Sequence, residues 1–449
     1  MSKTFRDWDV DQGWLLPASV HDFVPAGHLA HFVRDTVREA LDLSEVMKSY
    51  QEERGKPPYH PGMMVALLLY GYSRGVYSSR RLAQACEERV DMMAVTGLNR
   101  PDFRTIAEFR RRHMEALSGL FLQVLRLCQA AGLVKLGHVA VDGTKLKANA
   151  SRHKAMSYGR MKVAEPKLAA EVAEWLAKAD EADAAEDAQL GADQRGDETP
   201  GWMADKKRRL ERIREAKAQL EAEAAKAPAD FDANGPGPSS GMRERGKAKA
   251  PPAEGDTPPP VPPDKAQRNF TDGDSRIQPT HEGVIAGFNG QIAVDAAHQI
   301  IVAQQLTTNP ADFGALVPLV DQAHANLGRP IKEVSGDSGF ATEANIAAMD
   351  ARKIKAYLPP GRAKHGADHA AGEKLIINKP LTKVMVTKLK RGGRRSRYRL
   401  RKQTVEPVFG QIKQARGFRQ FLLRGLKNVR AEWSLICTVH NLLKLAAAA

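Results

Sequence analysis

Apolar residues recur at helical spacing through the first 135 residues of the chain. One stripe ends before residue 42, another runs from 106 to 127, and an apolar segment that opens with Pro61 lies between them. Ser78 stands where an N-cap is expected, ahead of Leu82 and Cys86. The pattern predicts an all-α N-terminal domain over residues 1–135. The two stripes are Leu29, Phe32, Val33, Val37 and Leu41, and Ile106, Phe109, His113, Leu117, Leu120, Val124 and Leu127.

The period changes at 136–150, where Val139 and Val141 flank Ala140 just before the pair Asp142-Gly143. A short apolar run followed by Asp-Gly predicts a buried strand that ends in an acidic turn. After residue 280, the segments EGVIAGFNGQIAVD and HQIIVAQQLTT predict two further strands joined by a short turn at 295–298.

The remaining segments alternate between helix and strand. We expect a helix over 309–328 with Asp312 near its cap, then a strand that runs into Asp337. A helix at 342–353, a strand at 354–360, a polar Gly-containing segment and a helix from about Thr404 complete the order.

Residues 157–268 differ in composition from their surroundings. Two charged, Ala-rich helical segments, the second with Leu210, Ile213 and Leu220 on one stripe, precede Pro/Gly-rich sequence that buries too little apolar surface to order itself. We interpret this region as an insertion, a helical hairpin followed by a flexible linker, and assign it no chemistry.

Without the insertions, the order of elements is that of an RNase H-like domain. Three antiparallel strands come first, and alternating helices and strands then extend a mixed sheet. We therefore expect an α/β RNase H-like catalytic domain made of residues 136–156 and 269–449, preceded by the helical N-terminal domain.

In such a sheet the first and fourth strands are neighbours, so Asp142 and Asp337 are expected to meet, and Glu406 in the first turn of the last helix can reach the same place. Each acid has a simpler explanation: a turn for Asp142, a loop or cap for Asp337, and a helix N-terminus for Glu406. Asp295 and Asp312 also end elements and compete for the place of Asp337.

Three carboxylates brought together repel one another unless cations neutralise them. Hard Mg²⁺ ions fit oxygen ligands of this kind, and a pair of them about 4 Å apart can hold the attacking and leaving oxygens of a phosphodiester. The sequence thus predicts two Mg²⁺ ions on Asp142, Asp337 and Glu406, with Mn²⁺ as a substitute.

Glu406 is the only acid between Lys383 and Arg430, a span with sixteen Lys and Arg residues. The net charge of +15 and a pI near 9.6 also fit a polyanion partner, nucleic acid ahead of an anionic membrane. Solvated charged helix faces are the alternative. The cations expected to contact DNA are Lys413, Arg401, Lys402, Arg416, Arg419 and Arg424 near Glu406, and Arg80, Arg81, Arg110 and Arg111 in the N-terminal helices.

Other features limit the class of protein. The longest apolar run, at 63–72, is too short to span a bilayer, and the N-terminus lacks the apolar segment of a secretion signal. Cys86, Cys128 and Cys437 lie far apart in apolar patterns, which favours a reducing cytoplasm. Cys437 and His440 share an apolar stripe, so we expect both in the core.

Five segments of the chain resemble the successive motifs of bacterial insertion-sequence DDE transposases: VAVDGTKLKANAS, NFTDGDSRI, GFNGQIAVD, VSGDSGFATEANI, and VEPVFGQIK with FLLRG. The stretches at 59–86 and 101–113 resemble the helical domain that often precedes their catalytic domain. The resemblance covers most of the chain outside the insertion.

The resemblance implies that Asp142, Asp337 and Glu406 form the catalytic triad of a Mg²⁺-dependent nuclease and strand transferase. Such an enzyme binds the terminal inverted repeats of its element, cleaves the ends and joins the 3′-hydroxyls to target DNA, as a dimer or larger assembly. Relatives carry Tyr-x2-Arg-x3-Glu-x6-Lys around the Glu. Here four residues separate Arg401 from Glu406, and Lys402 has the expected spacing.

Other interpretations stay open. An RNase H-like nuclease or resolvase would use water for the final attack, and a domesticated DNA-binding protein would have lost the chemistry. An RNA-binding helical scaffold would leave the three acids unexplained. For a transposase we expect the bacterial cytoplasm, with nucleoid association when DNA is bound.

Overall fold

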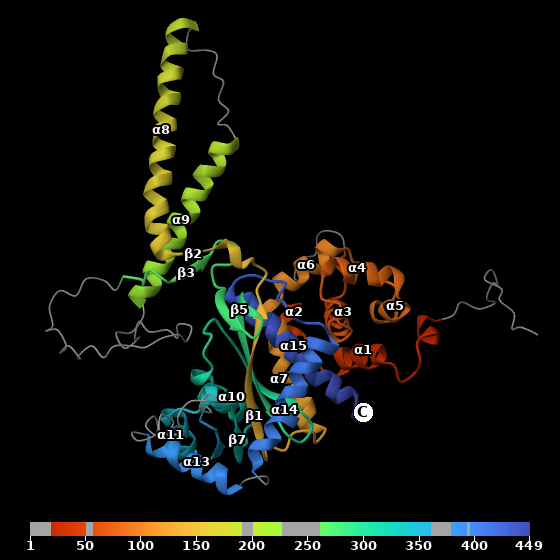
Figure 1. Ribbon diagram of the computed structural model, residues 1–449. Helices are drawn as coiled ribbons and strands as arrows, with labels where there is room; N and C mark the ends of the chain where they lie inside the picture. The colour runs from red at the N-terminus through yellow and green to blue at the C-terminus, as the bar shows by residue number, and fades with distance from the viewer. Residues whose placement is uncertain (1–18, 51–56, 191–200, 227–260, 361–378, 393–395) are drawn as a thin grey trace, which may run out of the picture. The chain divides into compact units, whose positions relative to one another are not determined.

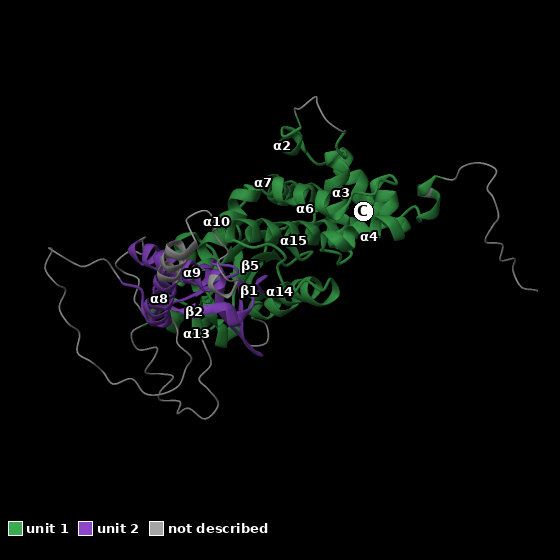
Figure 2. Cartoon of the chain, turned by 90° about the horizontal axis from the view of Figure 1, so that it is seen from above, with its two compact units in different colours: residues 1–146, 289–449 green, residues 147–288 purple. Residues whose placement is uncertain are grey.

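The computed structural model describes residues 19–50, 57–190, 201–226, 261–360, 379–392 and 396–449. The chain forms two compact units: unit 1 is Met1–Leu146 with Asn289–Ala449, and unit 2 is Lys147–Phe288 (Figure 2). The division into a helical domain, a catalytic domain and an insertion at 157–268 stays a prediction. Within the described residues, no helix has the length and apolarity needed to cross a bilayer.

The N-terminal part of unit 1 is helical, as predicted (Figure 1). Helix α3 is apolar on all sides and buried along its length, so the other helices pack around it. The stripe from Ile106 to Leu127 is interrupted at His113, between α6 and α7. The helices are α1 (Leu29–Glu39), α2 (Ser44–Met47), α3 (Pro61–Ser73), α4 (Ser79–Glu88), α5 (Val90–Thr96), α6 (Phe103–Arg112) and α7 (Met114–Ala130).

The sheet that follows has the mixed, RNase H-like arrangement. Its order is β4-β5-β1-β7-β8, with β6 paired to β5. β5 pairs with β4 and β6 in antiparallel fashion, whereas β7 is parallel to β1 and to β8. The strands are β1 (Val139–Lys147), β4 (Arg276–Thr280), β5 (Gly283–Asp295), β6 (Ile300–Thr307), β7 (Glu333–Ser335) and β8 (Lys355–Tyr357). The predicted adjacency of the first and fourth predicted strands, which correspond to β1 and β7, is confirmed.

Successive residues of β5 point to opposite faces of the sheet. One face is toward α15 (Leu426–Ala446), and the other is toward the start of α10 (Leu316–Leu327). A Cβ on Gly290 would lie 3.1 Å from the Trp433 ring of α15, so glycine allows this helix to pack closely. Asn289 and Gln291 on the other side contact Asp312, just before α10. The two helices therefore cover opposite faces of the sheet.

Within its described residues, unit 1 also contains α11 (Glu343–Ala351), α13 (Pro380–Gly392) and α14 (Leu400–Gly410). Helix α13 has no counterpart among the predicted elements. The prediction that Glu406 lies in the first turn of the last helix is wrong: α14 begins at Leu400, Glu406 lies in its second turn, and α15 follows.

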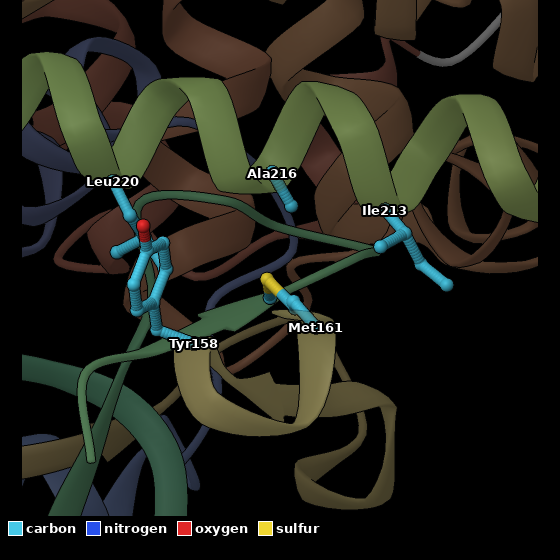
Figure 3. Packing of buried hydrophobic residues seen from close by; sticks show 5 residues of the cluster. All are labelled: Tyr158, Met161, Ile213, Ala216 and Leu220. Carbon is cyan, nitrogen blue, oxygen red and sulfur yellow. The ribbon is translucent and has the colours of Figure 1, made fainter. Parts of the chain in front are cut away.

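Unit 2 contains the predicted helical hairpin, α8 (Tyr158–Leu190) and α9 (Gly201–Lys226). A small core of Tyr158, Met161, Ile213, Ala216 and Leu220 joins the helices (Figure 3). At the base, β2 (Ala155–Ser157) pairs with β3 (Gln267–Asn269). The part predicted as a linker lies largely at 227–260, outside the described residues.

Candidate active site

The register of the sheet brings Asp142 and Asp337 together. β1 and β7 pair Val139 with Val334 and Ala140 with Ser335, and Asp142 and Asp337 each follow two residues after the last of these pairs, near enough for the Asp337 charge to act on Asp142. The Asp142 side chain is 14% exposed. Burial raises the pKa of this carboxyl to about 6; the nearby Arg401 charge opposes the rise and the Asp337 charge adds to it.

Strand β1 does not end at Asp142-Gly143, so the prediction of an acidic turn was wrong. The strand continues to Lys147, and glycine meets a packing requirement instead. A Cβ at Gly143 would lie 2.7 Å from the Asp312 Oδ1 atom, closer than side chains tolerate. Gly143 therefore lets a second carboxylate approach the strand next to Asp142.

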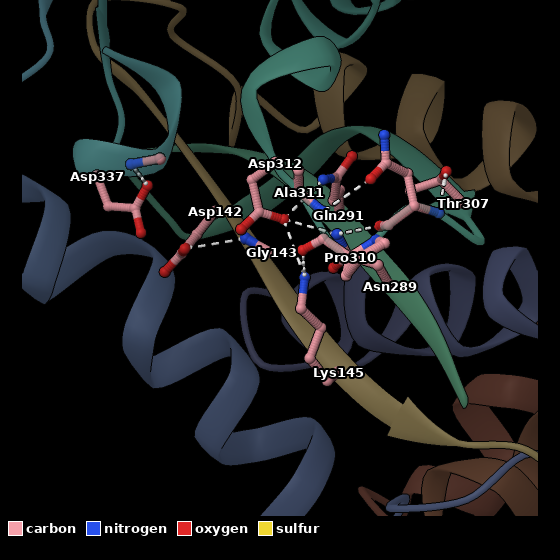
Figure 4. Close-up of polar contacts among 12 residues, drawn as sticks. Asp142, Gly143, Lys145, Asn289, Gln291, Thr307, Pro310, Ala311, Asp312 and Asp337 are labelled. Atoms are coloured by element: carbon pink, nitrogen blue, oxygen red, sulfur yellow. Dashed lines mark hydrogen bonds and ion pairs between the residues drawn. The ribbon is translucent and has the colours of Figure 1, made fainter. Parts of the chain in front are cut away.

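Asp312 belongs to a polar cluster on this face of the sheet (Figure 4). Its Oδ1 accepts hydrogen bonds from Asn289 Nδ2 at 2.6 Å and Gln291 Nε2 at 2.9 Å, and forms an ion pair with Lys145 Nζ at 3.2 Å. Lys145 Nζ also donates to the Pro310 carbonyl at 2.7 Å. Burial lowers the pKa of Lys145, and the Asp312 charge opposes this.

The expected capping role of Asp312 is not observed. Asp312 precedes a 3-10 turn at Phe313–Ala315, but its side chain makes no capping hydrogen bond. Asp312 is predicted only near a helix cap and as a rival of Asp337, and Lys145, Asn289 and Gln291 are not among the predicted site residues. The available signal was the pair of polar residues two apart in an apolar strand, which places both on one face.

Asp337 begins the turn Ser338–Phe340, and its Oδ1 accepts a hydrogen bond from the Gly339 backbone N–H at 2.8 Å. Asp312 lies beside this turn: a Cβ on Gly339 would be 3.7 Å from Asp312 Oδ2. The structure thus places Asp312, predicted as a rival of Asp337, in the same neighbourhood as Asp337 and Asp142.

Arg401 links Asp142 to Glu406. Its Nη2 lies 2.7 Å from Asp142 Oδ2, and its Nη1 lies 3.7 Å from Glu406 Oε1. The Arg401 side chain is 11% exposed, and its Nε is buried without a hydrogen-bond partner among the described residues. Lys402, which has the expected spacing, is exposed. In this structure Arg401 supplies the positive charge between the two carboxylates.

The donor set fits a hard divalent cation, because all three side chains present carboxylate oxygens. Within the described part of the chain, no three His, Cys, Asp or Glu side chains are already grouped as a metal site. The guanidinium of Arg401 lies against Asp142 and Glu406, so it must move before these two acids can share a metal. Asp142, Asp337 and Glu406 are the residues that would then hold it.

Asp295, the other rival for the second acid, lies away from this group. It is buried and accepts hydrogen bonds from the backbone N–H groups of Lys135 and Leu136, which precede β1. Burial raises the pKa of Asp295, and these backbone donors oppose the rise. Asp295 therefore fixes the chain at the amino end of β1, whereas Asp142 lies further along the strand.

The cations near Glu406 differ in their surroundings. Lys413 Nζ donates to the Lys145 carbonyl at 3.0 Å, and burial lowers its pKa. Arg416 is buried, and its Nη atoms have no hydrogen-bond partner within the described residues. Lys402, Arg419 and Arg424 are exposed. Arg416 therefore lies in the core and is unsuited to contact DNA in this conformation.

The cations of the N-terminal helices also divide into buried and exposed side chains. Arg110 is buried and donates to Tyr72, Ser79 and the Tyr77 carbonyl, so it ties α6 to the helices before it instead of facing DNA. Arg80, Arg81 and Arg111 are exposed, and Arg111 pairs with Glu108 at 2.6 Å.

Arg104, which the sequence analysis missed, belongs with the exposed cations of the N-terminal helices. Arg80 and Arg104 lie over the exposed Phe103 ring, at 5.2 and 5.7 Å from its centre. Guanidinium groups beside an aromatic ring form a surface of α4 and α6 that suits a polyanion.

Cys437 and His440 are core residues, as predicted. Both are buried in α15, and His440 Nε2 lies 2.9 Å from the Gln299 carbonyl oxygen. Burial lowers the pKa of His440 to about 3, so the ring is neutral.

The mixed, RNase H-like sheet, with Asp142 in β1 and Asp337 just after the neighbouring strand β7, fits the DDE class of transposases. The family comparisons agree: residues 18–112 match the Transposase domain (DUF772) and residues 259–442 match the Transposase DDE domain. The chain is a DDE transposase of the insertion-sequence type. No curated protein and no solved structure matches it significantly.

Asp337 and Glu406 lie within the matched DDE segment, but Asp142 lies in the stretch between the two matches. Its assignment therefore depends on the β1–β7 register and on its contact with Arg401.

Proposed function

We propose that this transposase binds the terminal inverted repeats of its insertion sequence, cleaves the DNA at the ends and transfers the 3′-hydroxyl strands to target DNA. Asp142, Asp337 and Glu406 hold two Mg²⁺ ions, for which Mn²⁺ can substitute. The observation that best supports this is the convergence of Asp142 with Asp337 through the register and with Glu406 through Arg401. DNA is the partner, in the bacterial cytoplasm, and two ends require a dimer or larger assembly.

When bound, the metal pair stabilises charge on the phosphodiester and activates the attacking water or 3′-hydroxyl. The residues of the chain prepare the place for it. Asn289, Gln291 and Lys145 fix one oxygen of Asp312. Arg401 leaves the carboxylates and pairs with a DNA phosphate, for which its planar guanidinium is suited. Lys413 stays near Lys145 and contacts a second phosphate.

The remaining DNA contacts are electrostatic. Lys402, Arg419 and Arg424 provide exposed charge around Glu406, and the basic surface of α4 and α6 provides it at the N-terminal helices, through Arg80, Arg81, Arg104 and Arg111. Sequence recognition of the repeats belongs to these helices, because a helix can enter the major groove.

The test is cleavage of labelled DNA that carries the element's own ends, with Mg²⁺ or with EDTA. We expect Mg²⁺-dependent cuts at the ends that disappear in Asp142→Ala, Asp337→Ala and Glu406→Ala. Asp350→Ala, which removes an exposed acid of α11, is the matched control and should cleave like the wild type. Binding without cleavage in the wild type would instead favour a domesticated DNA-binding protein.

A target plasmid in the same reaction separates the transposase from a nuclease or resolvase on the same fold. Joined products require attack by a 3′-hydroxyl, whereas a nuclease yields only cut ends. Cleavage that persists in Asp337→Ala would move the second acid to Asp312.

A further inference from the structure

Unit 2 contains a cavity of about 520 Å³ between the first residues of α8, strand β2 and helix α9. Most of its lining is basic, and Phe270 adds an aromatic ring. The basic side chains are His153, Lys154, Arg160, Arg208, Arg209 and Arg212. Among the described residues of the lining, Asp205 is the one acid, and it lies 3.9 Å from Arg208.

Several cations elsewhere in unit 2 are paired with acids. Lys217 and Arg214 both pair with Glu165, at 2.8 and 3.3 Å. Lys206 pairs with Glu171 at 2.8 Å, and Lys178 pairs with Glu174 at 2.7 Å. Among the described residues, Lys154, Arg160, Arg209 and Arg212 have no ion pair with an acid.

This difference falls within a single helix. Arg212 and Arg214 are both exposed on α9 and two residues apart, but only Arg214 faces an acid of α8. Positive groups that crowd one cavity with only one acid among them repel one another, and a bound polyanion removes this cost. The cavity is far larger than one phosphate group, and its size is typical of sites for extended ligands.

We propose that the cavity binds a stretch of DNA backbone, with Arg160, Arg209 and Arg212 on its phosphates. Guanidinium groups pair with phosphate oxygens through two parallel hydrogen bonds, and Phe270 offers an apolar surface to a sugar or base. The helical hairpin is then a DNA-holding element. This proposal rests on the proposed function, because in that function DNA is the polyanion that the protein binds.

The test compares two double variants of the full-length chain that lose the same charge. Arg209→Ala/Arg212→Ala removes two cavity cations, and Arg214→Ala/Lys178→Ala removes two exposed cations that are already paired. Fluorescence anisotropy measures binding of a short labelled duplex in EDTA at several salt concentrations, so cleavage is not required. Thermal unfolding checks that both variants are folded.

We expect the cavity variant to bind roughly 10- to 50-fold more weakly near 0.1 M salt, with a salt slope smaller by about 2. The control variant should remain close to the wild type. Equal binding by the two variants overturns the inference, and so does displacement of the DNA by RNA at lower concentrations than by unlabelled DNA. A wild type that binds but fails to cleave with Mg²⁺ overturns the proposed function alone.

Discussion

Buried titratable groups lie at two places along strand β1, its amino end and the stretch around Asp142, but their charges are compensated differently. At the amino end, Asp295 accepts hydrogen bonds from the backbone N–H groups of Lys135 and Leu136, at 2.9 and 3.1 Å. Further along, Asp142 pairs with the Arg401 side chain at 2.7 Å, and Asp312 pairs with Lys145 at 3.2 Å. Backbone donors cannot leave without unfolding the chain, whereas a side-chain cation can rotate away.

Burial raises the pKa of both Asp142 and Asp295, so a perturbed carboxyl does not by itself identify the reactive end. The reactive carboxyl is identified instead by a charged partner that can be exchanged. Where the neutralising charge belongs to a mobile side chain, a ligand can replace it. Where it belongs to the backbone, the acid has only a structural role.

The largest expected effect comes from substituting one acid at each of these two places, Asp142 and Asp295. Asp142→Ala should reduce end cleavage by about 1,000-fold or more, because metal ions supply several kcal/mol of transition-state stabilisation. Asp295→Asn should cleave at a rate close to the wild type but lose about 1–3 kcal/mol of unfolding free energy, because one buried backbone donor loses its acceptor. Cleavage rates and denaturant unfolding measure the two. The reverse result, an inactive Asp295→Asn and an active Asp142→Ala, would remove the distinction between the ends.

A smaller effect is expected from the glycines near the two ends. Gly143→Ala places a Cβ 2.7 Å from Asp312 Oδ1, so the strand or the carboxylate must shift, at about 1–3 kcal/mol of stability. Gly137→Ala has nothing within 4 Å and should be tolerated. Unfolding free energies test this pair, and cleavage should fall only in Gly143→Ala. Equal stability of the two variants would mean that Asp312 does not approach the strand as the structure has it.

The order of elements made the meeting of Asp142 and Asp337 predictable, since a right-handed crossover sets β7 beside β1. Other features depended on tertiary packing. Asp142-Gly143 has the composition of a turn, and only the approach of Asp312 explains the glycine within a strand. Asp312 likewise has the position of a helix cap, a local role that gives way to the pairing with Lys145.

The role of Arg401 is not predictable from the sequence, for a related reason. Motif spacing favoured Lys402, four residues before Glu406 and so on the same side of a helix. The structure selects Arg401 because its side chain reaches β1 and contacts Asp142, a partner that no spacing within α14 reveals.

The next expected effect concerns the guanidinium group of Arg401. Arg401→Ala should bind Mn²⁺ roughly 5- to 10-fold more tightly without DNA, because a partly buried ion pair worth about 1 kcal/mol no longer competes for Asp142 and Glu406. Lys402→Ala makes the same charge change next to it and should match the wild type. Titration followed by electron paramagnetic resonance at pH 8 reports free Mn²⁺ directly, independent of cleavage. Weaker Mn²⁺ binding in Arg401→Ala would show that Arg401 organises the carboxylates instead of occupying their place.

The smallest effect belongs to the amino end, where His138 precedes β1. Its Nδ1 lies 3.4 Å from Glu333 Oε2 and its Nε2 lies 3.0 Å from Ser335 Oγ. Burial lowers the pKa of His138, and Glu333 and Asp295 oppose this while Arg397 adds to it.

Because the folded-state pKa of His138 lies below the unfolded value of 6.5, the unfolded chain takes up a proton first as pH falls. Stability is therefore lost below pH 6.5, by at most about 1.4 kcal/mol per pH unit for this one group. His138→Gln should remove that part of the slope, as measured by denaturant unfolding from pH 7.5 down to 5, while Asp295 contributes equally to both chains. Above pH 7, His138 is neutral in both the folded and the unfolded chain. The difference in unfolding free energy between the variant and the wild type there reports packing alone. A variant whose slope equals that of the wild type would mean that His138 is not held neutral by its buried position.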